Sequence, residues 1–152
     1  HLGDKHDYRE QDHENWEQME AAILRDRPGG IIEPIYLMDH SGISIATSGE
    51  RFRAFDSVGW DWGQVGFVTA SGEAIRQNFG VQRISKQRRQ KAVEVLESEV
   101  ETYNSYLMGD VYCYTVKNGA GEVVDCQGCI IGLEETRETA NWSIGEGIAG
   151  AL

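Results

Sequence analysis

Cysteine and proline are scarce in this chain, which has three cysteines and two prolines in 152 residues. So few cysteines, in an odd number, exclude a disulfide scaffold and are typical of a reducing compartment. No run of 18 apolar residues occurs, and the first 30 residues are polar and acidic. A membrane-spanning helix and a signal peptide are therefore not predicted, and we expect a cytoplasmic protein.

Positive charge is also in short supply. The chain has 14 basic and 25 acidic residues, a formal net charge of −11. Because nucleic acids and anionic membranes require a basic surface, this charge disfavours both as direct partners. The same charge is compatible with a basic protein as a partner.

The length and the apolar patterns predict one α+β domain over residues 1–152. We expect a mostly antiparallel sheet of about five strands, with one face covered by a long helix. That helix is predicted from about Ser85 to Leu107, because Val93, Leu96 and Val100 recur at intervals of three and four residues. The expected strands lie near residues 31–38, 43–47, 64–70, 111–116 and 122–126.

Capping residues predict the ends of the remaining elements. Asp12 is expected to cap a helix over about 13–26, and Ser71 to cap a short helix that Gly80 closes. A further short helix is expected at about 133–141. Residues 1–12 are expected to form an extended acidic arm, and residues 143–152 a frayed tail.

The stretch from 31 to 70 holds the most informative turns. Pro34 cannot donate to a sheet ladder, so its strand is expected to be an edge strand or to carry a bulge. The turn at 39–42 predicts a hairpin. The following loop contains four aromatic residues, and we expect it to pack back over the sheet as a flap. These rings are Phe52, Phe55, Trp60 and Trp62.

The turn and the loop also supply the candidate site. Asp39, His40 and Asp61 are the catalytic candidates, because an imidazole beside a carboxylate can act as a general base near neutral pH. A binding pocket here is predicted to use His40, Ser41, Trp60, Asp61 and Gln64. However, adjacent turn residues rarely point at one another, and Ser41 lacks the flanking glycines of a hydrolase nucleophile.

Metal and cofactor sites are not predicted. His6 and His13 have neighbouring carboxylates but no recognised ligand spacing, and Cys126 and Cys129 form one C-x-x-C pair where a zinc ribbon needs two. Cys113 is expected opposite Cys126 in a hairpin turned at Asn118–Gly121. The interpretation we favour is buried structural cysteines, although three thiolates and one histidine would suffice for zinc.

Charge clusters suggest surfaces for a partner. The predicted acidic contact residues are Asp4, Asp7, Glu10, Glu94, Glu97 and Glu101. The segment Arg83–Lys91 is the one basic island, and it could either pair with the acidic arm, which we favour, or hold an anion.

Six segments together resemble a family of small, acidic, uncharacterised proteins of bacteriophages and other mobile elements. They lie in order at 2–8, 35–43, 62–68, 80–85, 99–103 and 109–112, reading LGDKHDY, IYLMDHSGI, WGQVGFV, GVQRIS, EVETY and GDVY. This family has no established activity, so the resemblance does not imply one for this chain. Where the family has a Trp-Asp-Ser-Gly-Gln loop, this chain has Trp62 at the serine, which argues against a catalytic hydroxyl there. The family's cysteine position is also shifted near Cys126, which argues against a metal site that depends on it.

Two functional hypotheses follow. The first is an accessory or counter-defence protein that binds a host protein through acidic surface. The second is a nucleotide-like small-molecule binder or hydrolase with a pocket around 39–42 and 60–64. The sequence does not specify the oligomeric state, and a homodimer is compatible with it.

Overall fold

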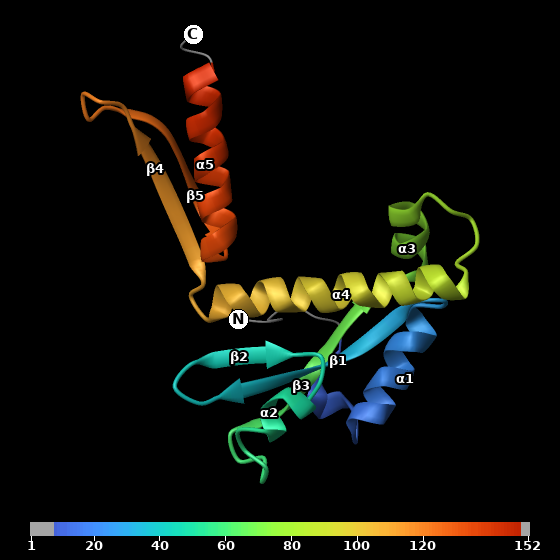
Figure 1. The fold of residues 1–152 in the computed structure, drawn as a ribbon. Coiled ribbons are helices and arrows are strands. Elements are labelled where there is room, and N and C mark those ends of the chain that lie inside the picture. Colours follow the sequence, from blue (N-terminus) through green and yellow to red (C-terminus); the bar gives the residue numbers. More distant parts are fainter. Residues whose placement is uncertain (1–7, 150–152) are drawn as a thin grey trace. The chain divides into compact units, whose positions relative to one another are not determined.

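The computed structural model describes residues 8–149 and has an α+β fold, as predicted (Figure 1). All five strands pair antiparallel, but they form two sheets, one of three strands and one of two. The chain contacts divide into two compact units, residues 1–101 and 102–152. The two units are therefore described separately.

The first unit is built on the sheet order β2-β1-β3. Its strands are β1 (Ile31–Asp39), β2 (Ile43–Ala46) and β3 (Trp62–Ala70). The predicted hairpin is confirmed, since Tyr36 to Asp39 pair with Ala46 to Ile43. β2 pairs with β1 only from Tyr36 onward. Pro34 therefore has no partner on β2 that would require a backbone N–H from it. The ladder to β3 shifts register between Ile35 and Tyr36, which confirms the predicted bulge.

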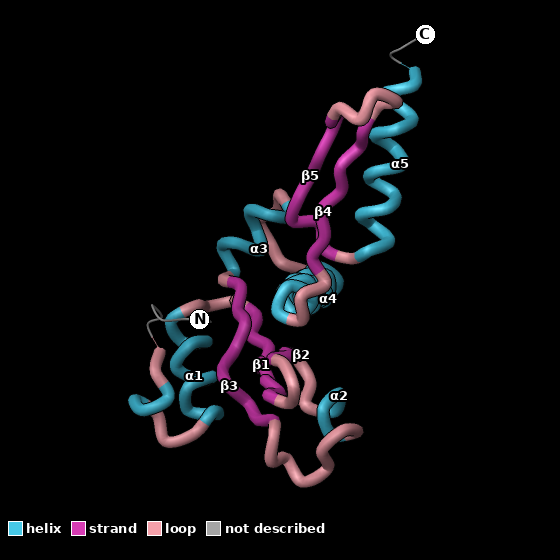
Figure 2. The backbone as a smooth tube through the Cα atoms, turned by 90° about the vertical axis from the view of Figure 1, so that its left-hand side faces the viewer, coloured by secondary structure: helices cyan, strands magenta, loops and turns pink. Residues whose placement is uncertain are grey.

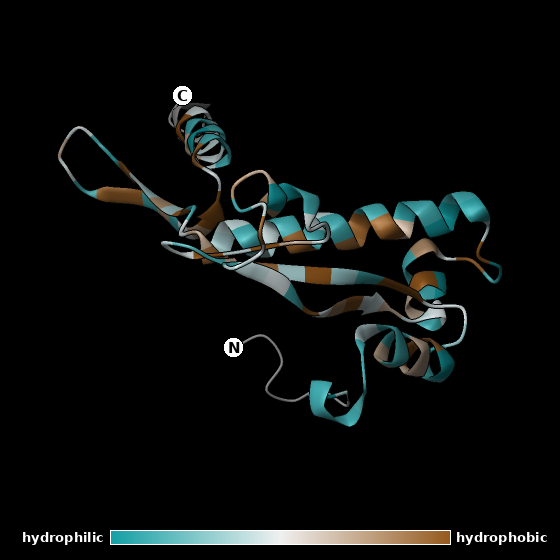
Figure 3. Cartoon of the chain, turned by 90° about the horizontal axis from the view of Figure 1, so that it is seen from below, coloured by the Kyte–Doolittle hydropathy of each residue, from teal (hydrophilic) through white to brown (hydrophobic). Residues whose placement is uncertain are grey.

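One face of this sheet carries the core. Ile31 packs with Ile75 of α3 (Gly72–Phe79) and with Ala92 and Leu96 of α4 (Lys86–Leu107). The sequence patterns for both helices are confirmed: the Ser71 hydroxyl accepts from the Ala74 N–H, and Gly80 closes α3 at φ 62°. The apolar stripe of α4 thus covers the sheet, while α1 lies on the opposite face (Figures 2 and 3).

The helix α1 (Trp16–Asp26) begins later than predicted. Its N-cap is Asn15, whose side chain accepts from the Gln18 N–H at 2.8 Å, so the prediction of Asp12 as the cap is wrong. Asp12 instead ends a short 3-10 turn, η1 (Glu10–Asp12). Asn15 lies in the extended region that an N-cap requires, one residue before the first apolar residue of the helix.

The second unit contains the hairpin of β4 (Val111–Lys117) and β5 (Val123–Ile131), with α5 (Leu133–Ala149) packed along both strands. Tyr114 donates to Asp125 across the hairpin at 2.8 Å, and Ser143 of α5 donates to the same carboxylate. These bonds, Ser143 foremost, lower the pKa of Asp125 by favouring its charged form. The carboxylate therefore joins all three elements.

Two predictions for this unit are wrong. Cys126 lies opposite Thr115, not Cys113, because the turn sets Lys117 opposite Val123 and the ladder then shifts register between Val116 and Lys117. The segment 143–149 is helical, so α5 continues beyond the predicted end at 141, and the rest of the expected tail, 150–152, lies outside the described residues. Gly145 and Gly147 do not end the helix, because a glycine inside a helix costs only about 1 kcal/mol.

Candidate functional site

The predicted site lies at one end of the three-stranded sheet, in two segments that we call the loop tip: residues 39–42 and 54–61. The first segment is the turn between β1 and β2. The second follows the short helix α2 (Glu50–Arg53) and leads into β3. The Asp39 N–H donates to the Asp61 carbonyl at 2.8 Å, so the sheet pairing itself holds the two segments side by side.

His40 and Asp61 meet across the loop tip. The imidazole Nδ1 lies 2.8 Å from Asp61 Oδ2. The two side chains are 68% and 43% exposed, so water surrounds the pair. An exposed contact of this kind contributes little to stability, but it orients the imidazole.

The other predicted residues do not join this pair. Gln64 donates to the Gly66 carbonyl of its own strand at 3.4 Å. Ser41 occupies the left-handed region at φ 59° in the exposed turn. Trp60 is 85% exposed. The structure thus brings His40 and Asp61 together and gives Gln64 a separate environment.

The aromatic residues of the loop divide into two pairs. Phe52 is 1% exposed, and its ring centroid lies 6.3 Å from that of Trp62, which also contacts Tyr36 at 6.0 Å. Phe55 and Trp60 are 79% and 85% exposed, so the prediction that all four rings pack over the sheet is wrong for these two. The chain passes the sheet at Phe52 and turns outward before it returns at Trp62.

Asp56 holds the outward turn in place. Its Oδ1 accepts from the N–H groups of Val58 at 3.0 Å and Gly59 at 3.1 Å, and its Oδ2 accepts from that of Asp61 at 2.9 Å. The Trp62 indole donates to the Asp56 carbonyl at 2.7 Å. These bonds, that of Asp61 foremost, favour the charged carboxylate and lower the pKa of Asp56.

Sequence reasoning missed Asp56 as a residue of this site. The signal that points to it is the run Asp-Ser-Val-Gly at 56–59, since an aspartate that accepts from the N–H groups two and three residues ahead is a recurrent turn. As a consequence, the apolar side chain of Val58, 73% exposed, is held in water between Phe55 and Trp60. The loop tip therefore combines a fixed backbone with three exposed apolar side chains.

The predicted acidic contact residues are only partly free. Glu94 pairs with Lys91 at 3.7 Å, and Glu101 pairs with Arg51 at 2.5 Å. Glu97 is exposed and has a charged neighbour, Glu33 of β1. The pKa of Glu33 is raised mainly by burial and further by the negative charges of Glu97 and Glu20. Asp4 and Asp7 lie outside the described residues, and Glu10 is exposed in η1.

The basic island has a structural role at Arg89, which donates to the carbonyls of Gly29 and Gly30 before β1. Over residues 8–149, no ion pair joins the island to the acidic arm. The favoured pairing with the arm is thus not seen in that range. His6 and the rest of residues 1–7 lie outside it.

Metal ligands do not gather in the part of the chain that the structure describes, where no three His, Cys, Asp or Glu side chains form a group able to hold an ion. Cys113, Cys126 and Cys129 are free thiols and all exposed, so the prediction that they are buried is wrong. Among the helices described, none has both the length and the apolarity to cross a membrane. No protein-family model, curated protein or solved structure matches the chain.

Proposed function

We propose that this protein acts by binding another protein, and that the loop tip is the contact surface. The observation that carries the proposal is the exposure of Phe55, Val58 and Trp60 at 79%, 73% and 85% on a backbone that Asp56 holds in place. Binding of a partner that covers these apolar side chains is favourable, because it removes apolar surface from water. Aromatic residues also dominate the binding energy of many interfaces. A loop already ordered also loses less entropy on binding.

The charge of the chain favours a protein over a nucleic acid as this partner. Stacking of bases on Trp60 would require basic flanking residues, and the loop 54–61 contains none. The net charge of −11 instead accelerates association with a basic protein. Glu10, Glu94, Glu97 and Glu101 then contribute to steering. The resemblance to phage and mobile-element proteins gives the proposal its specific form, a counter-defence inhibitor of a host protein.

The test compares partner capture by the native chain and by the double variant Phe55→Ser with Trp60→Ser. Both side chains are exposed, so we expect an unchanged melting temperature and at least a tenfold loss of the captured partner, measured by quantitative mass spectrometry of a host lysate. Trp142→Ser is the matched control, because Trp142 is 68% exposed in the second unit. Equal capture by the native chain and the double variant would contradict the loop tip as the contact.

A second candidate function rests on the His40–Asp61 pair at 2.8 Å. With Nδ1 donating to Asp61, the other imidazole nitrogen, Nε2, is an acceptor and can take a proton from water or from a ligand hydroxyl. The pair would then belong to a nucleotide-binding site or to the active site of a hydrolase.

This second function is tested by thermal unfolding against a panel of nucleotides and cyclic nucleotides. A ligand at 100 times its dissociation constant stabilises by about 2.7 kcal/mol, and His40→Ala should abolish that shift. If no nucleotide shifts the native protein, this second function is wrong.

A further inference from the structure

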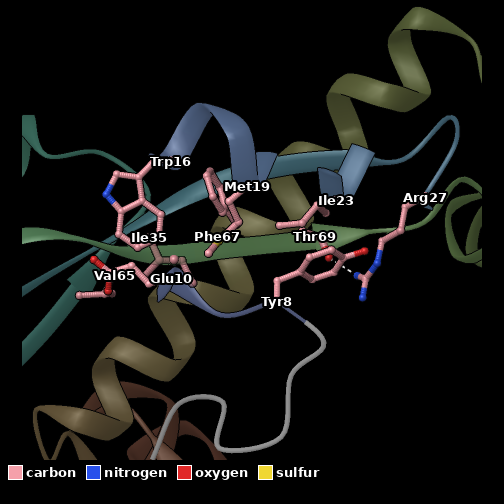
Figure 4. Close-up of a pocket in the computed structure, with 11 residues that line it drawn as sticks. Tyr8, Glu10, Trp16, Met19, Ile23, Arg27, Ile35, Val65, Phe67 and Thr69 are labelled. Atoms are coloured by element: carbon pink, nitrogen blue, oxygen red, sulfur yellow. Dashed lines mark hydrogen bonds between the residues drawn. The ribbon is translucent and has the colours of Figure 1, made fainter. Parts of the chain in front are cut away.

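A groove lies between α1 and the sheet, on the face opposite the core and distinct from the loop tip (Figure 4). Its volume is about 410 Å³, which is within the usual size range of small-molecule sites. Most of the wall is apolar. Trp16, Met19 and Ile23 line it from α1, and Val65 and Phe67 line it from β3.

The two ends of the groove differ in charge. Arg27 and Thr69 lie at one end with the ring of Tyr8, while Glu10 lies toward the opposite end beside Trp16 and Val65 (Figure 4). The Arg27 guanidinium donates to the Thr69 hydroxyl, and the Tyr8 hydroxyl donates to Asp26 at 2.9 Å. The groove is therefore an apolar trough with a cation at one end only.

Arg27 is half-buried and has no carboxylate partner among residues 8–149. This is unexpected in a chain with 25 acidic and 14 basic residues, where partners are abundant. A guanidinium has five N–H donors, and Thr69 accepts from one of them. The remaining donors can hold a carboxylate in the two-point geometry that arginine favours.

From this charge pattern we infer that the groove binds an organic monocarboxylate with an apolar tail, the chemistry of a medium-chain fatty acid. The carboxylate lies on Arg27 and Thr69, and the tail lies along Met19 and Phe67. Trp16 meets the Phe67 ring edge-on at 5.9 Å and closes the apolar wall. The carboxylate of Glu10 disfavours a second anionic group at the far end, so the site distinguishes a monocarboxylate from a dicarboxylate.

Calorimetric titration of the full chain with decanoate, kept below its micellar concentration, tests the site. We expect saturable one-to-one binding, with decanedioate and 1-decanol both at least about tenfold weaker. Arg27→Gln should weaken decanoate binding at least tenfold. Arg25→Gln should leave it unchanged, because Arg25 carries the same charge in the same helix turn but pairs with Asp26 at 3.5 Å outside the groove.

Thermal unfolding of Arg27→Gln separates loss of the ligand from loss of the fold. Should that variant unfold, Val65→Glu serves instead, since Val65 is 48% exposed and a charged side chain at that end of the groove would disfavour the apolar tail of the ligand. The double variant Phe55→Ser with Trp60→Ser should bind decanoate normally, which makes this site independent of the proposed protein contact. Absence of saturable decanoate binding, equal binding of 1-decanol, or an equal effect of Arg25→Gln would overturn the inference. Capture of a partner's free carboxyl-terminal peptide without any decanoate binding would overturn it too.

Discussion

At the scale of single residues, a few side chains decide how the loop tip is built. Asp56 fixes the outward turn with its carboxylate, and Trp62 anchors the return into β3 by its indole N–H. Phe52, 1% exposed, fills the space beneath. The backbone that Asp56 and Trp62 hold in place turns away from the sheet between them. Phe55 and Trp60 therefore remain exposed to water although both side chains are apolar.

Gly49 is required by the position of Trp62. A Cβ at Gly49 would lie 2.6 Å from Cζ3 and 3.0 Å from Cη2 of the Trp62 ring, which Tyr36 and Phe52 hold in place. Gly49→Ala should therefore destabilise the protein by about 1–3 kcal/mol through overpacking, measured by urea unfolding. Gly63→Ala is the matched control, because a Cβ at Gly63 meets nothing within 4 Å. Similar losses in both variants would show that the Trp62 contact is not the cause.

Glu33 should make stability depend on pH. Burial, with the charges of Glu97 and Glu20, raises its pKa above the ordinary 4.5. The folded chain therefore holds this proton to a higher pH than the unfolded chain, and stability falls as pH rises through the interval between the two pKa values. Glu33→Gln should stabilise the protein at pH 7, and the gain should vanish below pH 4.5.

The expected gain is small, under about 1 kcal/mol or roughly 2 °C, because Glu33 is only half-buried. Melting curves at pH 4 and 7 measure it. Glu99→Gln is the control for the change in net charge, since Glu99 is exposed on α4. A gain at pH 7 that is equal in both variants would assign the effect to net charge rather than to Glu33.

At the scale of elements, capping decides where the helices begin and end. Ser71 and Gly80 delimit α3, and both ends follow from residue type alone. For α1 two capping residues compete in one stretch, Asp12 and Asn15. Asn15 is the cap because it directly precedes Trp16, the first residue of the apolar stripe that lines the groove.

Asn15→Ala should destabilise the first unit by about 1 kcal/mol, because it leaves the Gln18 N–H without its acceptor. Asp12→Ala should change the stability by less than about 0.5 kcal/mol, since Asp12 is exposed outside the helix. Chemical denaturation of the two variants measures the difference. A larger loss for Asp12→Ala than for Asn15→Ala would contradict the observed cap.

At the scale of the whole molecule, the buried side chains are unevenly distributed between the units. The first unit holds the core of Ile31, Ile75, Ala92 and Leu96 with its packed neighbours. Over residues 102–145, Ile130 is the single buried apolar side chain. A two-stranded hairpin with one helix and so small a core is marginal by itself.

We therefore expect a fragment of residues 1–107, which keeps α4 whole, to unfold cooperatively on heating. A fragment of residues 102–152 should show no cooperative transition. Circular dichroism of the two purified fragments checks both statements. A cooperative transition in the second fragment, or its absence in the first, would contradict this assignment of stability.

The sequence by itself determined the elements whose signals are local: the hairpin at 39–42, the caps of α3, the stripe of α4 and the bulge beside Pro34. Periodicity and capping depend on residues within a few positions of one another, so they can be read along the chain. Only the tertiary structure decided the division of the strands into two sheets, the meeting of His40 with Asp61, and the approach of Arg27 to Thr69 in the groove. Each depends on residues distant in sequence, whose approach is set by packing and register rather than by local preference.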